Sequence, residues 1–147
     1  MGGARYYLWR AVDQDGETLD ILVQKRRNTR AAKRFFCKLL KGLRYVPNRL
    51  VTDKLRIYGA AHRTTLPSVQ HCTTQYANNR AELSHEPTRV RERGMRKFKS
   101  IEQAQRFLGA HAAVYNLFNL GRHLISAENY RYFRIRAFAS WKKAVAI

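Results

Sequence analysis

The sequence predicts an α/β fold whose C-terminal part is helical. Four strand-like segments lie within the first 73 residues and alternate with helical patterns, whereas residues 100–147 show helical patterns only. This order is typical of an α/β domain that ends in helices. The chain has 147 residues, of which 45% are hydrophobic and 12% aromatic, so it suits one domain with a real core.

The first two strand-like segments predict an antiparallel hairpin. Residues 6–12 (YYLWRAV) and 18–24 (TLDILVQ) are rich in the aromatic and β-branched side chains that favour strands. The segment between them, residues 13–16 (DQDG), is acidic and contains glycine, which is typical of a hairpin turn.

An amphipathic helix is predicted over residues 30–43, with Asn28 or Thr29 as its N-terminal cap. Its apolar side chains recur at spacings of three and four, while lysines and arginines take the other face. A phenylalanine and leucine stripe at this spacing is far more often core than a ligand pocket. We therefore expect this helix to pack on the sheet.

A short strand is predicted next, at residues 49–52, most simply parallel to an earlier strand because a helix intervenes. Asp53 then stands at the carboxyl end of this strand, where functional groups gather in open α/β sheets. Residues 54–62 suggest a short helix, and residues 69–73 suggest a last short strand.

A helix is predicted to follow Asn78 and Asn79 and to run toward Phe98, but Pro87 interrupts the pattern. Proline lacks an amide hydrogen and clashes with the preceding turn of a helix. Two alternatives follow. Either the helix begins near Ser84 and holds Pro87 in its first turn, or a longer helix is kinked at Pro87.

Two further helices are predicted in the last third of the chain. Ser100 and Gln103 have the spacing of a capping box, and Ser126 can cap a final helix. Six apolar residues of that final helix are expected to pack against the rest of the molecule: Tyr130, Phe133, Ile135, Phe138, Trp141 and Val145.

The charge of the chain favours a polyanionic partner. Lys and Arg number 29 against 10 Asp and Glu, which gives a formal charge of +19. DNA or RNA suits this excess better than an anionic membrane surface. No apolar run is long enough to span a membrane, and the N-terminus lacks a signal-peptide pattern, so we expect a cytoplasmic protein without a membrane partner.

One stretch concentrates this charge next to a carboxylate. Glu82 is followed by a run of cations that can neutralise several phosphates, although the same run is also compatible with a solvated helix face. The predicted nucleic-acid-binding residues are Arg80, Arg89, Arg91, Arg93, Arg96, Lys97 and Lys99.

Two carboxylates suggest a metal site. Asp53 at a strand end and Glu82 near a helix start can converge if the intervening chain turns back across the sheet. Carboxylates are the ligands that Mg²⁺ prefers, and a pair of divalent ions can stabilise both the attacking and the leaving oxygen of a phosphodiester. Their spacing alone is weak support, because two acidic residues this far apart occur in most proteins. Other signals for catalysis are missing, including a phosphate-binding glycine loop, a nucleophile elbow and a zinc spacing of cysteines.

At these residues the chain resembles the DDE transposases of bacterial insertion sequences, in the group called insertion sequence six. The resemblance runs in one register from about Tyr6 to the C-terminal helix. The segments that carry it are residues 7–16 (YLWRAVDQDG), 24–29 (QKRRNT), 51–56 (VTDKLR), 78–82 (NNRAE), 91–93 (RER) and 98–100 (FKS).

The resemblance implies an RNase H-like fold with a triad of two Asp and one Glu that binds two Mg²⁺ (or Mn²⁺) ions. It implies cleavage and strand transfer on double-stranded DNA, namely the insertion-sequence ends and the target, by a full-length protein that works as an oligomer. By this match Asp53 corresponds to the second Asp of the triad and Glu82 to its Glu. We expect residues 1–99 to form the catalytic domain and residues 100–147 a helical part of the same domain.

The sequence also departs from the family. The family's first triad Asp lies on a strand upstream of the segment that opens this chain, and Asp13 and Asp15 align with a later turn. Leu83 and Glu86 replace an expected Asn and Gln. We therefore expect a copy truncated at the N-terminus, lacking the first strand of the sheet and inactive on its own. The alternatives are a non-catalytic basic module that binds nucleic acid and an RNA-associated structural protein.

Overall fold

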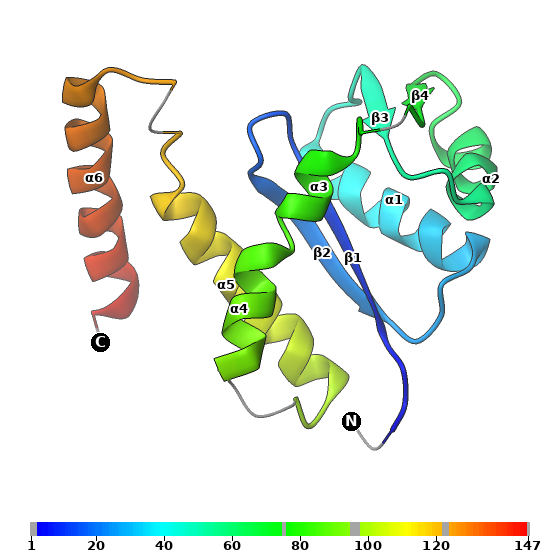
Figure 1. Cartoon of the computed structure of the whole chain (residues 1–147), viewed down its shortest axis with the longest axis horizontal. Helices are drawn as coiled ribbons and strands as arrows, with labels where there is room; N and C mark the ends of the chain where they lie inside the picture. Colours follow the sequence, from blue (N-terminus) through cyan, green and yellow to red (C-terminus); the bar gives the residue numbers. More distant parts are fainter. Residues whose placement is uncertain (1–2, 75, 95–97, 122–123, 147) are drawn as a thin grey trace.

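The computed structural model of the chain describes residues 3–74, 76–94, 98–121 and 124–146. Its strands and helices confirm the predicted α/β class and the helical C-terminal part (Figure 1). In chain order they are β1 (Tyr7–Val12), β2 (Thr18–Gln24), α1 (Thr29–Leu43), β3 (Arg49–Val51), α2 (Arg56–Thr65), β4 (Gln70–Cys72), α3 (Asn79–Leu83), α4 (Glu86–Gly94), α5 (Ile101–Phe118) and α6 (Ala127–Val145).

Strands β1 and β2 form the predicted antiparallel hairpin, with Trp9 opposite Leu22 and Arg10 opposite Ile21. Gly16 closes its turn with a φ of 86°, a left-handed conformation that glycine adopts without strain. Because successive side chains of a strand point to opposite faces, the hairpin packs helices on both sides. Trp9 and Leu22 face α1, whereas Ile21 packs against α5.

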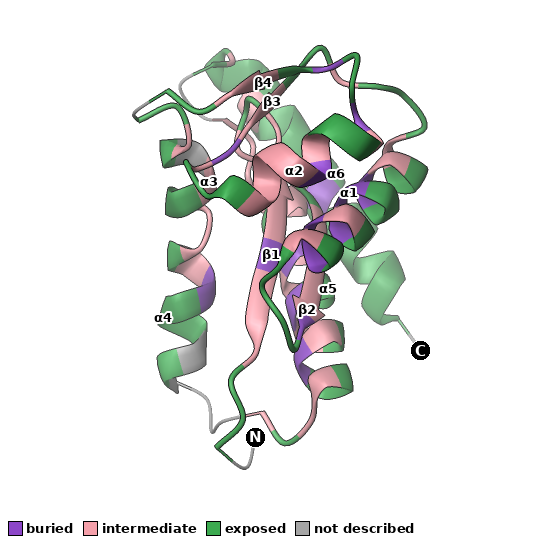
Figure 2. Ribbon diagram, turned by 90° about the vertical axis from the view of Figure 1, so that its right-hand side faces the viewer, coloured by how far each residue is buried: buried purple, intermediate pink, exposed green. Residues whose placement is uncertain are grey.

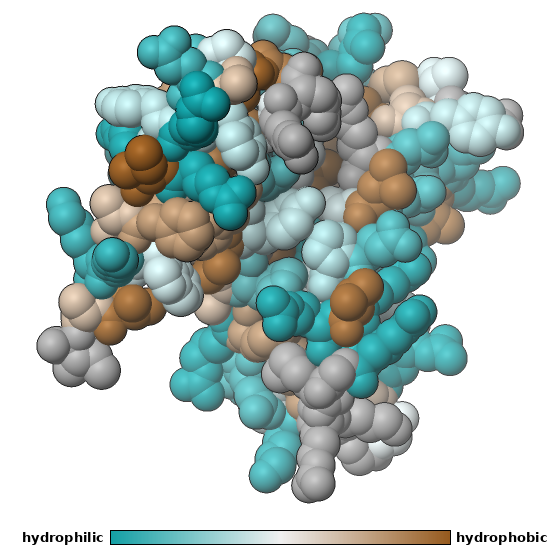
Figure 3. Space-filling model, turned by 60° about the vertical axis from the view of Figure 1, so that its left-hand side comes forward, coloured by the Kyte–Doolittle hydropathy of each residue, from teal (hydrophilic) through white to brown (hydrophobic). Residues whose placement is uncertain are grey.

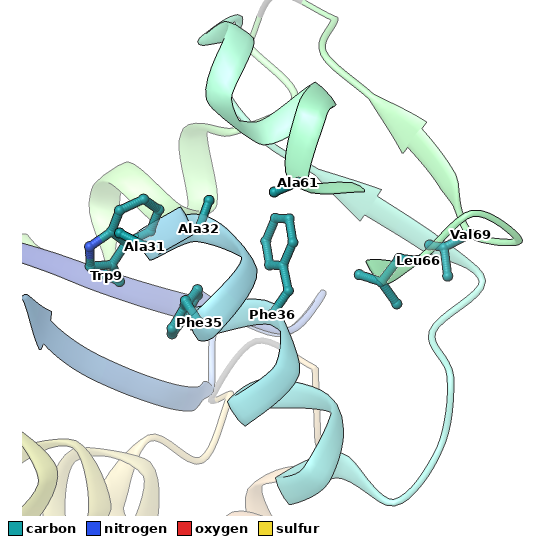
Figure 4. Close-up of a cluster of buried hydrophobic side chains, with 8 residues drawn as sticks. All are labelled: Trp9, Ala31, Ala32, Phe35, Phe36, Ala61, Leu66 and Val69. Carbon is teal, nitrogen blue, oxygen red and sulfur yellow. The ribbon is translucent and has the colours of Figure 1, made fainter. Parts of the chain in front are cut away.

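The main core lies between the hairpin, α1 and α2. Phe35 and Phe36 of α1 contact Trp9 and Tyr58, with ring centroids 6.0 and 6.2 Å apart for the Trp9–Phe35 and Phe36–Tyr58 pairs. Figure 4 shows Phe36 directed toward Ala61 of α2, with Trp9 next to Ala31 near the start of α1. This confirms that the phenylalanine stripe of α1 is core. The buried cluster is Trp9, Ala31, Ala32, Phe35, Phe36, Ala61, Leu66 and Val69.

Helix α5 covers the other face of the hairpin and also its outer edge. Leu108 and Ala112 form a second buried cluster with Ile21. In Figure 2 the buried positions concentrate where α1, the hairpin and α5 meet. The side chains of Gln105 and Asn116 then bond the free backbone groups of β2, which anchors α5 along the strand.

Strands β3 and β4 pair in parallel, with Leu50 opposite His71, and form a sheet of their own. The prediction that β3 pairs with an earlier strand is wrong, because its partner β4 follows it and α2 forms the crossover between them. Within the described ranges the strands make two separate two-stranded sheets, not the single mixed sheet expected of an RNase H-like fold.

The region around Pro87 divides into two helices. The short helix α3 ends at Leu83, and α4 begins at Glu86 with Pro87 in its first turn, where a missing amide hydrogen does not matter. The structure therefore selects a late start over a kink. The other predicted caps are confirmed: Asn28, Ser100 and Ser126 accept a backbone N–H from the first turns of α1, α5 and α6.

Helix α6 packs less than its sequence predicts. It lies beyond α5, away from the hairpin, and only Ala137 of its residues is buried (Figure 1). Phe138 and Trp141 contact Phe118 of α5, but Ile135 is 70% exposed. Figure 3 shows the side of the molecule that carries α6, where hydrophilic side chains cover most of the surface and apolar ones are scattered. No helix within the described ranges is long and apolar enough to cross a bilayer.

Candidate active site and nucleic-acid interface

Asp53 lies two residues after the last residue of β3, and both of its carboxylate oxygens have partners. Oδ1 accepts the backbone N–H of Leu55 at 3.0 Å, which holds the turn into α2. Oδ2 lies 3.3 Å from the guanidinium of Arg27, and both side chains are partly exposed. Asp53 is thus fixed in place, and a cation stands beside it.

The residue before Asp53 is held from the neighbouring strand. Thr52 is buried, and its hydroxyl lies 2.7 Å from Nε2 of His71 on β4 and 2.9 Å from the carbonyl oxygen of Asp53. If the hydroxyl donates to that carbonyl, His71 must donate to the hydroxyl through Nε2–H. Burial, with a smaller effect of His62, lowers the pKa of His71. A neutral ring with its proton on Nε2 suits this arrangement.

Glu82 lies in α3, on the exposed side of that short helix. The helix is tied to the hairpin by Arg10 of β1. Its guanidinium donates to the carbonyl oxygen of Ser84 and to the hydroxyl of Thr88, the latter at 2.6 Å. Burial lowers the pKa of Arg10, and a buried guanidinium without hydrogen-bond partners would destabilise the fold. Arg10 thus fixes the junction between α3 and α4 and thereby the position of Glu82.

The two carboxylates predicted to bind metal line one cavity of about 910 Å³. It lies between β1, β3, α1 and α3, and Asn78 and His85 line it together with Asp53 and Glu82. Carboxylate oxygens are the donor type that Mg²⁺ or Mn²⁺ prefers, so the chemistry of these donors fits such an ion. Among the residues that the structure describes, no three side chains of His, Cys, Asp or Glu gather closely enough to hold a metal by themselves.

His85 lies in the junction between α3 and α4 and lines this cavity as well. Burial, and to a smaller extent the charges of Arg10 and Arg89, lower its pKa from 6.5 to about 4. The imidazole is therefore neutral at physiological pH and can accept or donate one hydrogen bond. In the sequence, His85 stands three residues after Glu82.

Of the predicted DNA-binding cations, Arg80 belongs to α3, Arg89, Arg91 and Arg93 belong to α4, and Lys99 comes just before α5. Arg89, Arg91, Arg93 and Lys99 are exposed. Arg89 also lines a smaller hollow beside the main cavity, together with Arg27 and His85. The side chain of Arg80 and the residues Arg96 and Lys97 lie outside the described part of the chain.

Sequence reasoning missed Arg10 and Arg27. Arg10 bonds to a residue 74 positions away and Arg27 to one 26 positions away, so no local pattern reports either contact. One signal was available for Arg10: an arginine in the middle of an aromatic strand needs a partner when it is buried.

The fold is α/β, and Asp53 after a strand and Glu82 on a helix line one cavity, with the arginine-rich helix α4 close by. The model of the family described as "DDE domain" matches residues 1–120, and the chain belongs to this family. This confirms the resemblance seen in the sequence.

Two of the most similar relatives are named transposases of Staphylococcus aureus. One is the transposase for insertion sequence-like element IS431mec, and the other is the transposase for insertion sequence element IS257 in transposon Tn4003. Each is 31% identical to this chain over 121 residues, which are 79% of this chain and 52% of the relative. The chain thus spans about half the length of these relatives. No solved structure matches it.

Proposed function

We propose that this chain serves DNA transposition, as part of a DDE transposase that cleaves and transfers strands of double-stranded DNA. The observation that carries the proposal is that Asp53 and Glu82, far apart in the sequence, line one cavity. Family membership supports it, since the most similar relatives are named transposases. The order of a hairpin, a helix and two strands joined by a crossover helix supports an RNase H-like arrangement. In this proposal residues 1–99 carry the catalytic elements and residues 100–147 the helical part of the same domain.

Asp53 and Glu82 are the residues that would hold Mg²⁺ or Mn²⁺. Bound there, the metal would stabilise charge on the oxygens of a phosphodiester. Thr52 and His71 fix the backbone beside Asp53, and Arg10 fixes the junction that follows the helix of Glu82, so the backbone that carries both carboxylates is held in place. The exposed cations of α4 would contact phosphates of the bound DNA, and such contacts orient a duplex without reading its sequence.

We propose further that the 147-residue chain, by itself, binds DNA but does not transfer strands. The resemblance implies a triad to which Asp53 and Glu82 would contribute two carboxylates, and Arg27 is paired to Asp53. Two carboxylates hold a pair of divalent ions weakly. The matched region is 52% of each relative's length, so this chain corresponds to about half of such a transposase.

A cleavage and strand-transfer assay on duplex DNA, with Mg²⁺ and with Mn²⁺, tests these proposals. We expect salt-sensitive DNA binding without strand transfer. The Asp53→Asn, Glu82→Gln double variant serves as the control, and Mn²⁺ binding followed by electron paramagnetic resonance should weaken in it. Metal-dependent transfer by the unaltered chain that disappears in the double variant would contradict the proposed inactivity and would establish the catalytic role of the two carboxylates.

A second candidate function is a DNA-binding module that uses only its basic surface. The ion pair between Arg27 and Asp53 favours it, because a guanidinium occupies one oxygen of the proposed metal ligand. In that case Asp53→Ala and Glu82→Ala leave DNA affinity unchanged both with and without Mg²⁺. If the metal site works, Mg²⁺ should strengthen DNA binding by the unaltered chain and not by these variants.

A further inference from the structure

We propose that the outer face of α6 binds single-stranded DNA, at a site separate from the cavity of Asp53 and Glu82 and from the cations of α4. The family model matches residues 1–120, and α6 begins only at Ala127, so the proposed function makes no use of this helix. The proposal rests on how α6 packs, on what its outer face exposes, and on the charge of that face.

The inner face of α6 already has a partner within the chain. Ala137 is buried, and the rings of Phe138 and Trp141 lie 5.1 and 6.5 Å from the ring of Phe118 on α5, centroid to centroid. The guanidinium of Arg134 lies over the ring of Phe138 at 5.7 Å. These contacts attach α6 to α5, next to which it runs in Figure 1. The opposite side of the helix is therefore the side that remains open to a partner.

The outer face of α6 exposes a short apolar line. A helix advances by about 100° per residue, so Tyr132, Ile135 and Ala139 lie in one line opposite the packed residues. Tyr132 is 55% exposed and Ile135 is 70% exposed. Ala139 is exposed as well, and its small side chain leaves the line accessible. The line ends at charged residues on both sides, at Glu128 and at Lys143, so it is too short for the continuous apolar stripe through which helices pair.

Cations border this apolar line on both sides. By the same helical spacing, Arg131 and Lys142 lie on one side of it and Arg136 and Lys143 on the other, and all four are exposed. The guanidinium of Arg136 lies 5.7 Å from the ring centroid of Tyr132. None of the four has an ion pair among the residues that the structure describes. Positive groups thus surround an exposed ring and have no acidic partner of their own.

The positive charge is concentrated on this helix. Helix α6 carries five Lys and Arg against one acidic residue, Glu128, whereas α5, of similar length, carries one of each, Arg106 and Glu102. A polyanion complements such a face, while a second copy of this chain, also of formal charge +19, is repelled by it. A helix that lies in a membrane surface separates its apolar and charged faces. In α6 they are interleaved, as the scattered apolar side chains of Figure 3 illustrate.

A single strand matches both components of the face. Its phosphates pair with the cations, and its bases have free faces that stack on an aromatic ring or pack on an apolar side chain. In a duplex each base is already paired and stacked on its neighbours, so Tyr132 and Ile135 would stay uncovered. An arginine beside the ring adds a cation–π contribution to such a site. The choice of DNA over RNA rests on the proposed function.

Fluorescence anisotropy with the intact chain and two labelled oligomers tests the proposal. One oligomer is a thymidine single strand of about twelve nucleotides, within the range of known single-strand sites, and the other is the same sugar–phosphate backbone without bases. Both carry the same phosphates, so the difference in affinity reports the bases alone. We expect the unaltered chain to prefer the thymidine oligomer. Tyr132→Ala should weaken binding of that oligomer by about fivefold or more and leave binding of the baseless one unchanged.

Two further variants separate stacking from other effects. Tyr132→Phe keeps the ring and should keep the preference for the thymidine oligomer. Tyr76→Ala removes a tyrosine that is 73% exposed in the turn before α3, and it should keep the preference too. Alanine favours helix at an exposed position, so circular dichroism should show the helix content of the Tyr132→Ala variant unchanged.

The proposal is overturned if Tyr132→Ala weakens binding of both oligomers equally or of neither, because the bases then do not stack on α6. It is also overturned if a uridine RNA oligomer binds more tightly than the thymidine oligomer through Tyr132, or if Tyr132 mediates self-association in sedimentation without nucleic acid. The readout involves neither the metal nor strand transfer, and duplex binding by α4 is measured separately. The proposal can therefore fail while the proposed function stands, and the reverse.

Discussion

At the scale of single residues, the contact between Arg10 and Thr88 connects the hairpin to α4. Thr88 is buried, and its hydroxyl accepts from the guanidinium at 2.6 Å. Thr88→Val removes the acceptor and leaves a half-buried cation short of a partner, so we expect a loss of about 1.5–3 kcal/mol in the free energy of unfolding. Urea denaturation followed by circular dichroism measures it. Thr88→Ser keeps the hydroxyl and should retain most of the stability; equal stability of the Val variant would refute the role of this bond.

The neutral state of His85 makes stability depend on pH. Its pKa is about 4 in the folded chain and 6.5 in an unfolded one, so between these values the unfolded state binds more protons. The contribution of His85 to the free energy of unfolding is thus fully present above pH 6.5 and is lost as the pH falls toward 4. After discounting for partial exposure, we expect about 1–2 kcal/mol from this residue.

The measurement compares urea denaturation of the unaltered chain and of His85→Gln at pH 7 and at pH 4.5. Glutamine does not titrate, so the variant should lose less stability between the two pH values than the unaltered chain. A matched loss in both proteins would show that His85 does not control the pH dependence.

Arg27 modulates the metal affinity of Asp53. The ion pair is partly exposed, so removing it should change the free energy of unfolding by less than about 1 kcal/mol. Arg27→Gln frees one carboxylate oxygen and removes a positive charge, so we expect tighter Mn²⁺ binding in an electron paramagnetic resonance titration. Arg26→Gln removes the same charge from the neighbouring residue, which has no ion pair among the described residues. An equal effect of both variants would mean that only the net charge matters.

At the scale of elements, α5 is held to β2 by side chains that act as a substitute strand. Gln105 bonds Val23 and Ile21 at 2.8 and 2.9 Å, and Asn116 bonds both backbone groups of Thr18. Gln105→Leu leaves two partly buried backbone groups unpaired, and we expect it to destabilise the chain by about 1–3 kcal/mol. Thermal unfolding measures the loss of stability. The control is Arg106→Leu, which changes an exposed residue of the same helix. No loss beyond that of the control would mean that water replaces the glutamine.

The helices could be predicted from the sequence because their signals are local. The Ser100–Gln103 capping box and the stripe of Phe35 and Phe36 lie within a few residues of each other, so spacing alone reports them. The hairpin was predictable for the same reason. The partner of β3 was not, because β-strand pairing joins distant segments and depends on the whole sheet.

The packing of α6 was also not predictable from the sequence, although the helix itself was. Apolar residues at helical spacing indicated the helix correctly, but a periodic pattern does not name the surface that covers it, and Ile135 stays exposed. In the candidate site, Asp53 and Glu82 could be proposed because each follows a recognisable element boundary. Arg10 and Arg27 could not, since their partners lie far away in the sequence.

At the scale of the whole molecule, a formal charge of +19 on 147 residues attracts a polyanion to the protein as a whole. Affinity for DNA alone therefore does not identify the binding surface. The salt dependence of affinity does, because its slope counts the phosphates that the protein neutralises. Helices α1 and α4 allow a matched comparison, since the side chains of Trp9 and Arg10 connect them to opposite faces of β1.

We expect that changing Arg89, Arg91 and Arg93 of α4 to glutamine reduces the slope of log K against log salt by about one unit for each cation that contacts a phosphate, hence by about three. The control changes three exposed cations of α1, Arg30, Arg34 and Lys41, to glutamine and removes the same net charge. Fluorescence anisotropy with one labelled duplex over a series of salt concentrations measures both slopes. If DNA lies on α4, the first slope falls and the second stays near that of the unaltered chain. An equal decrease of the slope in both variants would mean that neither helix is the preferred DNA-binding surface. A larger decrease in the α1 variant would mean that DNA binds to α1.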